Sequence, residues 1–236
     1  MKPILVVQNF PAAGAGRFST LMSEHGIAQR TVLGNEADYD QLSSKDFSAL
    51  VVLGGPQSAY QTEEYPYLLN EIVLCQDFLD KRKPIAAFCL GAQLLALAVG
   101  GEVVSGEYKE IGWYDLRLNS AAADDPLLAD HPEALISYHF HGDCIRDVPG
   151  CTKLASSALT PIQLFRHGDN AYGFQYHAEI DGVLLERMCR NNREFLTACG
   201  VDPEALIDES RQHLPAFERH CRTILDRWLD LVASAD

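Results

Sequence analysis

The sequence has no long hydrophobic run. No stretch reaches the roughly 18 consecutive apolar residues that a membrane-spanning helix requires. The start of the chain carries one charge and a short apolar run, Ile4–Val7, which is far shorter than the apolar region of a signal peptide. We therefore expect no secretion signal and no membrane segment.

Positive charge is also scarce. Lys and Arg total 19 against 33 Asp and Glu, which gives a formal net charge of −14 for 236 residues. A chain this acidic repels phosphate backbones at long range, so we expect no nucleic-acid binding. The 7 cysteines form an odd set without Cys-x-x-Cys spacing, which favours reduced thiols and a cytoplasmic location over a disulfide framework.

Internal repeats, low-complexity tracts and linkers are absent as well. With 47% hydrophobic residues, the chain is long enough to bury a sizeable core. We expect a single domain over residues 1–236, in which residues 180–236 form a helical extension packed on the rest.

The first hundred residues alternate apolar runs of strand length with segments of helical period. This pattern is typical of an α/β fold, in which crossover helices join parallel strands. Strands are expected at Ile4–Val7, Ile27–Leu33, Ala49–Leu53 and Pro84–Phe88. Helices are expected over Gly14–His25, from Leu68 to Leu79, and over Leu90–Val99. Cys89 then lies at a strand-to-helix junction.

The next segment, residues 102–179, predicts short strands and turns. The candidates are Ile111–Leu118, Leu135–His139, Lys153–Ser156, Pro161–Arg166 and Ala171–His177. The last two flank His167–Asn170, a Gly- and Asn-containing stretch typical of a hairpin turn. From residue 180 onward the pattern is helical, with expected interruptions near Gly200–Pro203 and near Pro215.

Cys89 has small residues two positions before and after it, Ala87 and Gly91. A nucleophile elbow requires this, because a strand that turns so tightly into a helix leaves no room for bulk. The following helix would direct its N-terminal amides at the sulfur, where they stabilise a thiolate and a developing oxyanion. A free cysteine is also a small hydrophobic residue that is commonly buried, so this segment alone leaves both interpretations open.

Two further segments are candidates for the same site. At an expected strand end, a period of two would place His177 and Glu179 on one side, where a carboxylate can orient an imidazole. Gly54 and Gly55 follow the third strand, and glycine lets the main chain approach a substrate closely. A solvated strand end and an ordinary turn are the alternatives. In a doubly wound sheet these loops meet at one crevice, so the segments support one another.

His139 and His141 lie two residues apart on an expected strand and face the same way, a spacing known from metal ligands. Cys89 and His177 could complete such a site. No third and fourth ligand follows at short spacing, so we expect no metal.

These segments together resemble the class I glutamine amidotransferase domain, most closely the stand-alone proteins related to the amidotransferase half of GMP synthase. The similarity runs from about Ile4 to Glu179. The segments that carry it are Gly54-Gly55-Pro56, Phe88-Cys89-Leu90-Gly91-Ala92-Gln93, Glu110-Ile111-Gly112-Trp113, His141-Gly142-Asp143, Leu154-Ala155-Ser156-Ser157 and Gly173-Phe174-Gln175-Tyr176-His177-Ala178-Glu179.

The resemblance implies a three-layer, flavodoxin-like fold with a mostly parallel sheet, extra short strands and a helical C-terminus. It implies a triad of Cys89, His177 and Glu179 that hydrolyses the side-chain amide of glutamine to glutamate and ammonia through a γ-glutamyl thioester, without metal or cofactor. The N–H groups of Gly55 and Leu90 would form the oxyanion hole. The implied substrate-binding residues are Gly54, Gly55, Leu90, Gln93, Phe140, Gly142 and Asp143.

Two positions depart from the family pattern. Ala87 stands where glycine is usual, and Ala178 replaces the usual proline between His177 and Glu179. Proline would restrict the preceding residue to extended geometry, so we expect a looser His177.

The residues after Glu179 contain no Gly-rich phosphate loop of the kind an ATP-using synthase needs. Three functions remain: a glutaminase that supplies ammonia to a separate synthase subunit, a hydrolase of γ-glutamyl peptides or amides, and a catalytically silent interaction subunit. The intact triad residues argue against the last. The ammonia acceptor and the formation of a homo-oligomer stay open.

Overall fold

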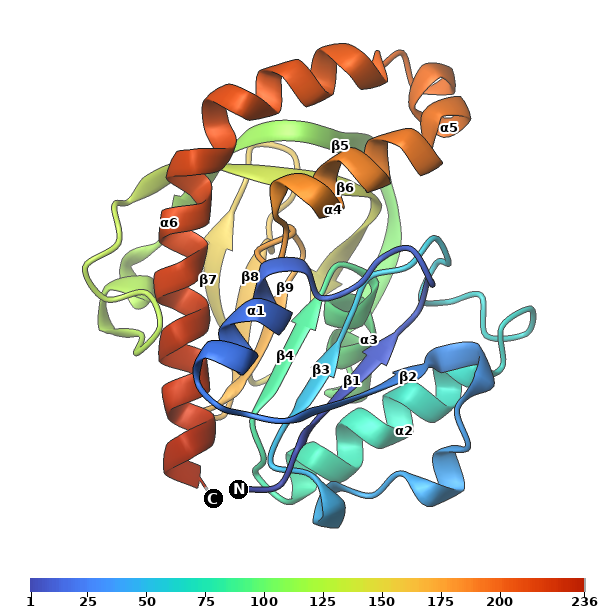
Figure 1. Ribbon diagram of the computed structural model, residues 1–236, viewed down its shortest axis with the longest axis vertical. Coiled ribbons are helices and arrows are strands. Elements are labelled where there is room, and N and C mark those ends of the chain that lie inside the picture. Colours follow the sequence, from blue (N-terminus) through green and yellow to red (C-terminus); the bar gives the residue numbers. More distant parts are fainter. Residues whose placement is uncertain (236) are drawn as a thin grey trace.

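The structure, a computed structural model, describes residues 1–235 and contains a nine-stranded sheet (Figure 1). The strand order is β2-β1-β3-β4-β9-β8-β7-β5-β6. The strands of the parallel half are β1 (Ile4–Gln8), β2 (Gln29–Leu33), β3 (Leu50–Val52), β4 (Ile85–Phe88) and β9 (Ala171–Phe174). The strands that continue it with antiparallel pairing are β8 (Leu164–His167), β7 (Thr152–Ser156), β5 (Glu102–Leu118) and β6 (Ala134–Asp147).

Helices cover both faces of the parallel half. The helices of residues 1–235 are α1 (Gly16–Glu24), α2 (Tyr67–Asp80), α3 (Leu90–Ala98), α4 (Gly182–Asn191), α5 (Arg193–Ala198) and α6 (Pro203–Ala235). In β1, Ile4 and Val6 pack in the core that α1 and α6 cover, while Leu5 and Val7 pack in the core of α2 and α3. A strand covered on both sides is apolar at every position. The predicted α/β fold with flanking helices is confirmed.

Strands β5 and β6 are longer than the short strands that the sequence predicts. They have 17 and 14 residues and pair from Glu102 opposite Asp147 to Arg117 opposite Ala134. Many side chains of β5 between residues 102 and 109 are exposed, and the register with β6 shifts between Ser105 and Glu110. The apolar pattern in the sequence therefore predicted only the buried part of β5 and of β6.

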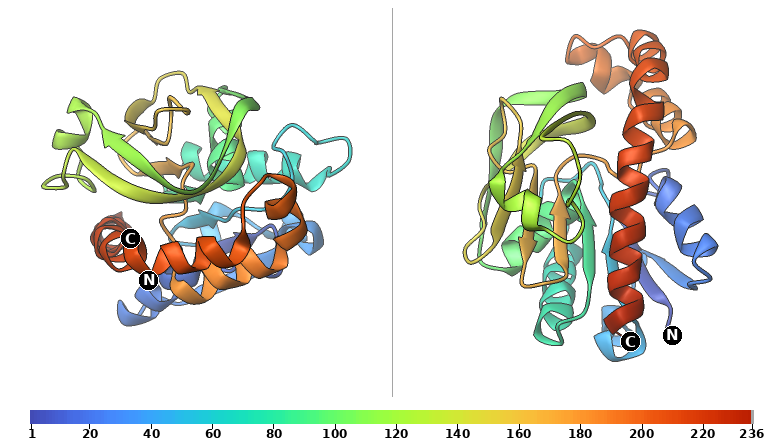
Figure 2. Two further views of the ribbon diagram at one scale, coloured as in Figure 1. Left: turned by 90° about the horizontal axis from the view of Figure 1, so that it is seen from above. Right: turned by 90° about the vertical axis from the view of Figure 1, so that its left-hand side faces the viewer.

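The C-terminal helices match the prediction at one break and contradict it at the other. The chain leaves helical structure between Ala198 and Pro203, but Pro215 lies inside α6 instead of interrupting it. In Figure 1, α6 crosses the top of the molecule and then runs down one side, so the helix bends, as helices that contain proline do. Figure 2 shows its second stretch extending along the sheet.

The apolar face of α6 covers the core of this chain. Trp228 is fully buried and meets Phe18 of α1 edge to face, with 5.4 Å between ring centroids. Its indole N–H donates a hydrogen bond to the carbonyl oxygen of Ile85, at the start of β4. Within residues 1–235, no helix is both long and apolar enough to span a membrane.

Candidate active site

Cys89 occupies a tight turn between β4 and α3. Its backbone has φ 51° and ψ −110°, a region that residues other than glycine rarely adopt. A β-carbon at Gly91 would lie only 2.2 Å from the carbonyl oxygen of Val52, and Ala87 pairs with Gly173 of the neighbouring strand. Gly91 and Ala87 therefore occupy the positions where a tight strand-to-helix turn leaves no room for a larger side chain.

The neighbouring strand β9 brings His177 and Glu179 to the same place. The N–H of Cys89 donates to the carbonyl oxygen of Phe174, the last residue of β9. His177 follows in a loop, not in the strand as predicted, and its Nδ1 lies 2.8 Å from Oε1 of Glu179. Its own N–H donates to the carbonyl oxygen of Tyr138. These two contacts position His177, and the looser His177 expected from Ala178 stays a prediction.

Cys89 and His177 flank Gly54. A β-carbon at Gly54 would lie 3.3 Å from Cβ of Cys89 and 3.5 Å from Cε1 of His177. The Nε2 atom of His177 is buried and has no hydrogen-bond partner within residues 1–235. Burial lowers the His177 pKa, but the negative charges of Glu179 and Cys89 outweigh burial and raise it to about 10. The site therefore favours an imidazolium.

A cleft of about 510 Å³ opens over these residues. All ten residues that the sequence assigned to catalysis or substrate binding line it: Gly54, Gly55, Cys89, Leu90, Gln93, Phe140, Gly142, Asp143, His177 and Glu179. They come from the ends of β3, β4 and β9 and from β6. Parallel strands place their carboxyl ends at one edge of the sheet, which explains the convergence.

Two polar residues of the cleft have defined partners. The side-chain amide of Gln93 donates to Oε1 of Gln175 and to the carbonyl oxygen of Asp143, at 3.2 and 3.4 Å. The Asp143 carboxylate accepts a hydrogen bond from the hydroxyl of Tyr60 at 3.0 Å. Asp143 itself belongs to β6.

The family model of class-I glutamine amidotransferases matches residues 20–191, well over half of the sequence. The chain belongs to this family. It is 34% identical over 157 residues to the glutamine amidotransferase-like protein YfeJ of Salmonella typhimurium, a match that covers 65% of this chain and 66% of YfeJ. It is 33% identical over 138 residues to one subunit of the glutamine-hydrolysing GMP synthase of Haloarcula marismortui, a match that covers 57% of this chain and 66% of that protein.

These matches span just under two thirds of the length of the two curated relatives. A crystal structure of a glutamine amidotransferase from Thermotoga maritima is similar over 96% of this chain and 97% of that one. The TM-score is 0.88 and the sequence identity is 25%.

The sequence did not predict the part of the cleft that the C-terminal helices form. Leu184 and Met188 of α4 and Phe195 of α5 line it. The ring of Phe195 lies 6.0 Å from the ring of Phe140, and the ammonium of Lys109 lies 4.7 Å from the Phe195 ring centre. Leu184 and Met188 are four residues apart, which indicates one helix face but not what that face covers.

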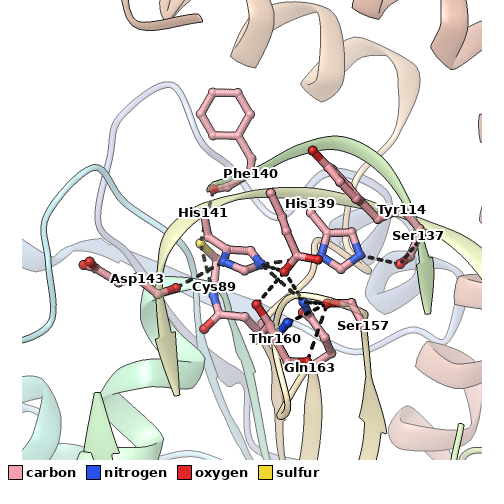
Figure 3. Close-up of polar contacts among 12 residues, drawn as sticks. Cys89, Tyr114, Ser137, His139, Phe140, His141, Asp143, Ser157, Thr160 and Gln163 are labelled. Carbon is pink, nitrogen blue, oxygen red and sulfur yellow. Dashed lines mark hydrogen bonds and ion pairs between the residues drawn. The ribbon is translucent and has the colours of Figure 1, made fainter. Parts of the chain in front are cut away.

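A second polar cluster adjoins the cleft. His139 and His141 share a face of β6, and the third possible metal ligand beside them is Glu110 of β5. Cys89 and His177, which the sequence offered as further ligands, are not part of this group. Figure 3 shows the two imidazoles surrounded by Ser137, Thr160 and Gln163. Of the two histidines, His141 also lines the cleft.

Proposed function

We propose that this protein hydrolyses the side-chain amide of glutamine, or of a small γ-glutamyl compound, with Cys89 as nucleophile and the His177–Glu179 pair as its base. The 2.8 Å contact between His177 Nδ1 and Glu179 Oε1, beside a cysteine at a strand-to-helix turn, carries the proposal. A carboxylate in this position holds one tautomer of the imidazole and stabilises the imidazolium.

The chemistry proceeds in two steps. The Cys89 sulfur forms a bond to the δ-carbonyl carbon of the substrate, and the carbon–nitrogen bond breaks as His177 gives its proton to the departing nitrogen. Ammonia or an amine leaves. A water molecule then loses a proton to the same imidazole and attacks the γ-glutamyl thioester. The carbon–sulfur bond breaks, which releases glutamate and restores the Cys89 thiolate beside the protonated His177.

The oxyanion of each step needs hydrogen-bond donors. Leu90 is the first residue of α3, and the N–H groups of a first helical turn have no partner within the helix. A β-carbon at Gly55 would lie 3.0 Å from the Leu90 side chain, so the two residues are neighbours in the cleft. We assign the oxyanion hole to the N–H groups of Gly55 and Leu90.

The amino-acid end of the substrate would bind on the opposite side of the cleft. Asp143 supplies a carboxylate for the α-ammonium group, and the backbone around Phe140 and Gly142 supplies groups for the α-carboxylate. A buried charge that lacks its partner costs several kcal/mol, so an analogue without the α-amino group should be rejected strongly.

The α4 and α5 wall favours a second candidate, a γ-glutamyl amide whose nitrogen carries an apolar group. The cleft volume lies within the range that holds ligands of drug size, and Leu184, Met188 and Phe195 give one wall an apolar surface. With glutamine as substrate, the released ammonia would pass to a separate synthase protein, since one relative of this chain is named as a subunit of GMP synthase.

The test combines labelling with a substrate series. A glutamine-analogue electrophile should label Cys89, and glutamine should be hydrolysed far faster than its des-amino analogue. Equal rates for these two compounds would contradict the assignment of Asp143 and its neighbours. Activity confined to γ-glutamyl amides with apolar substituents would favour the second candidate. An unlabelled Cys89 without any amide hydrolysis would contradict both candidates and favour a silent interaction subunit.

A further inference from the structure

The cluster of Glu110, His139 and His141 is buried behind the wall of the cleft. The exposed fractions of the three residues are 1%, 0% and 8%. Glu110 pairs with His141 in the β5–β6 ladder, and His139 lies two residues further on the same face. The chemistry proposed above uses none of these side chains.

Two distances between the donor atoms match those around a tetrahedral metal ion. Nε2 of His141 lies 3.4 Å from Oε2 of Glu110 and 3.4 Å from Nδ1 of His139. Ligand atoms at about 2.0–2.1 Å from a tetrahedral zinc ion are about 3.3–3.4 Å from one another. All the donor atoms of the cluster lie within 4.8 Å of each other.

Outer hydrogen bonds orient each side chain as they do around metal ligands. Nδ1 of His141 lies 3.1 Å from the carbonyl oxygen of Asp143. A carbonyl can only accept, so Nδ1 carries the proton and Nε2 presents its lone pair to the cluster, where the side-chain amide nitrogen of Gln163 lies 3.5 Å from it and would be displaced by an ion. Nε2 of His139 lies 2.6 Å from the hydroxyl of Ser137, which leaves Nδ1 directed at His141.

The carboxylate is held in the same way. Oε2 of Glu110 accepts hydrogen bonds from the hydroxyl of Thr160 at 2.5 Å and from the amide of Gln163 at 2.7 Å. Its second oxygen, Oε1, is buried and has no hydrogen-bond partner within residues 1–235. The same is true of Oε1 of Gln163.

We propose that Glu110, His139 and His141 bind one divalent transition-metal ion, with zinc as the best fit. Two imidazoles and one carboxylate are ligands that suit zinc. The ion would reach the site from the cleft, which His141 lines. Its role would be structural, because it would fix the strand segment from His139 to Asp143 that forms the substrate side of the cleft. This inference does not depend on the proposed function.

The test measures metal binding by the full-length chain. The protein would be stripped with a chelator, dialysed and titrated with Zn²⁺ against a chromogenic chelator, both as wild type and as Cys89→Ala, in which the reactive thiol cannot bind the ion. We expect one Zn²⁺ per chain in both proteins. His139→Gln and Glu110→Gln should lose this binding, and Ser137→Ala should weaken it about 10- to 100-fold. His213→Gln, which changes a histidine on α6 outside the cluster, is the matched control and should bind normally.

Co²⁺ provides a readout that does not need a folded variant. Bound to the wild-type cluster, it should show strong tetrahedral visible absorption without the near-ultraviolet charge-transfer band of a thiolate ligand. A missing stoichiometric uptake, an octahedral spectrum or a thiolate band would each overturn the proposal. So would undiminished Zn²⁺ binding by folded His139→Gln and Glu110→Gln. Labelling of Cys89 by the glutamine analogue, measured separately, tests the proposed function and not the metal site.

Discussion

Gly91 lies directly against Val52, so close that a β-carbon at Gly91 would come within 2.2 Å of the Val52 carbonyl oxygen. The contact joins the first turn of α3 to the neighbouring strand β3. It sets the angle at which the chain turns at Cys89.

Replacing Gly91 should distort this turn. We expect Gly91→Ala to lose about 1–3 kcal/mol of unfolding free energy through overpacking, and most of its amidase activity through displacement of Cys89. Urea denaturation and steady-state ammonia release measure the two effects. Gly14→Ala is the control, because a β-carbon at Gly14 meets no atom within 4 Å. Equal behaviour of the two variants would show that the elbow tolerates bulk.

Cys89→Ala should abolish amide hydrolysis while the fold survives. The thiol supplies the covalent step, and alanine fits the space of cysteine, so turnover should fall at least about a thousandfold. Circular dichroism and thermal unfolding check the fold. Cys144→Ala, a half-buried cysteine elsewhere on β6, is the matched control. Turnover near the wild-type value in Cys89→Ala would refute the nucleophile assignment.

Glu179→Gln should lower kcat much more than it raises KM. An amide cannot stabilise the imidazolium of His177, and without this charge burial would dominate and lower the His177 pKa. We expect a loss of about a hundredfold to ten-thousandfold in kcat. Glu186→Gln, an exposed change on α4, serves as the control. An unchanged kcat would show that Glu179 does not support His177 in catalysis.

Glu71 makes the stability of the protein depend on pH. It is buried on α2 and accepts hydrogen bonds from Asn9 and Tyr39. Burial raises its pKa from 4.5 to about 7, although the two hydrogen bonds act in the opposite direction. Between these values the folded state binds more protons than the unfolded state, so this group makes stability fall as the pH rises.

Glu71→Gln should remove this fall. Urea denaturation between about pH 4.5 and about 7 should show a smaller decline of the unfolding free energy with pH than in the wild type. Glu36→Gln is the exposed control and should follow the wild-type curve. Parallel curves for wild type and Glu71→Gln would show that Glu71 titrates as it does in the unfolded chain.

The single-domain organisation remains a prediction, which Trp228→Ala tests. We expect this change to lose about 3–5 kcal/mol of unfolding free energy, because the indole fills the space between α6 and Phe18. A chain truncated after Pro203 should be insoluble or unfolded. A soluble, stable truncate that has lost only self-association would show that α6 serves as a docking surface.

The local sequence predicted the parallel half of the sheet and which residues converge at the cleft, while their roles stay a prediction. Apolar runs such as Ala49–Leu53 indicate strands covered on both faces, and the small residues around Cys89 indicate its tight turn. The sequence pattern was wrong where burial does not determine the structure. The outer part of β5 is mostly exposed and its register with β6 shifts, and Pro215 lies inside α6, which bends.

Contacts between segments far apart in the sequence explain why the sequence did not predict Phe195 and Glu110. Phe195 reaches the cleft because the chain returns over it after β9, and nothing in its own neighbourhood indicates this. Likewise, no residue close in sequence to His139 and His141 completes their cluster. Glu110 lies on the preceding strand, and only the register of β5 with β6 brings it opposite His141.

The edge-to-face contact of Trp228 with Phe18 has a consequence for synthesis in the cell. The ribosome releases Trp228 210 residues after Phe18 (228 − 18), so one face of the growing sheet stays uncovered until α6 has been made. Contacts of such large sequence separation also slow folding. The nascent chain should therefore be a client of chaperones that bind exposed apolar surface, until α6 closes over that face.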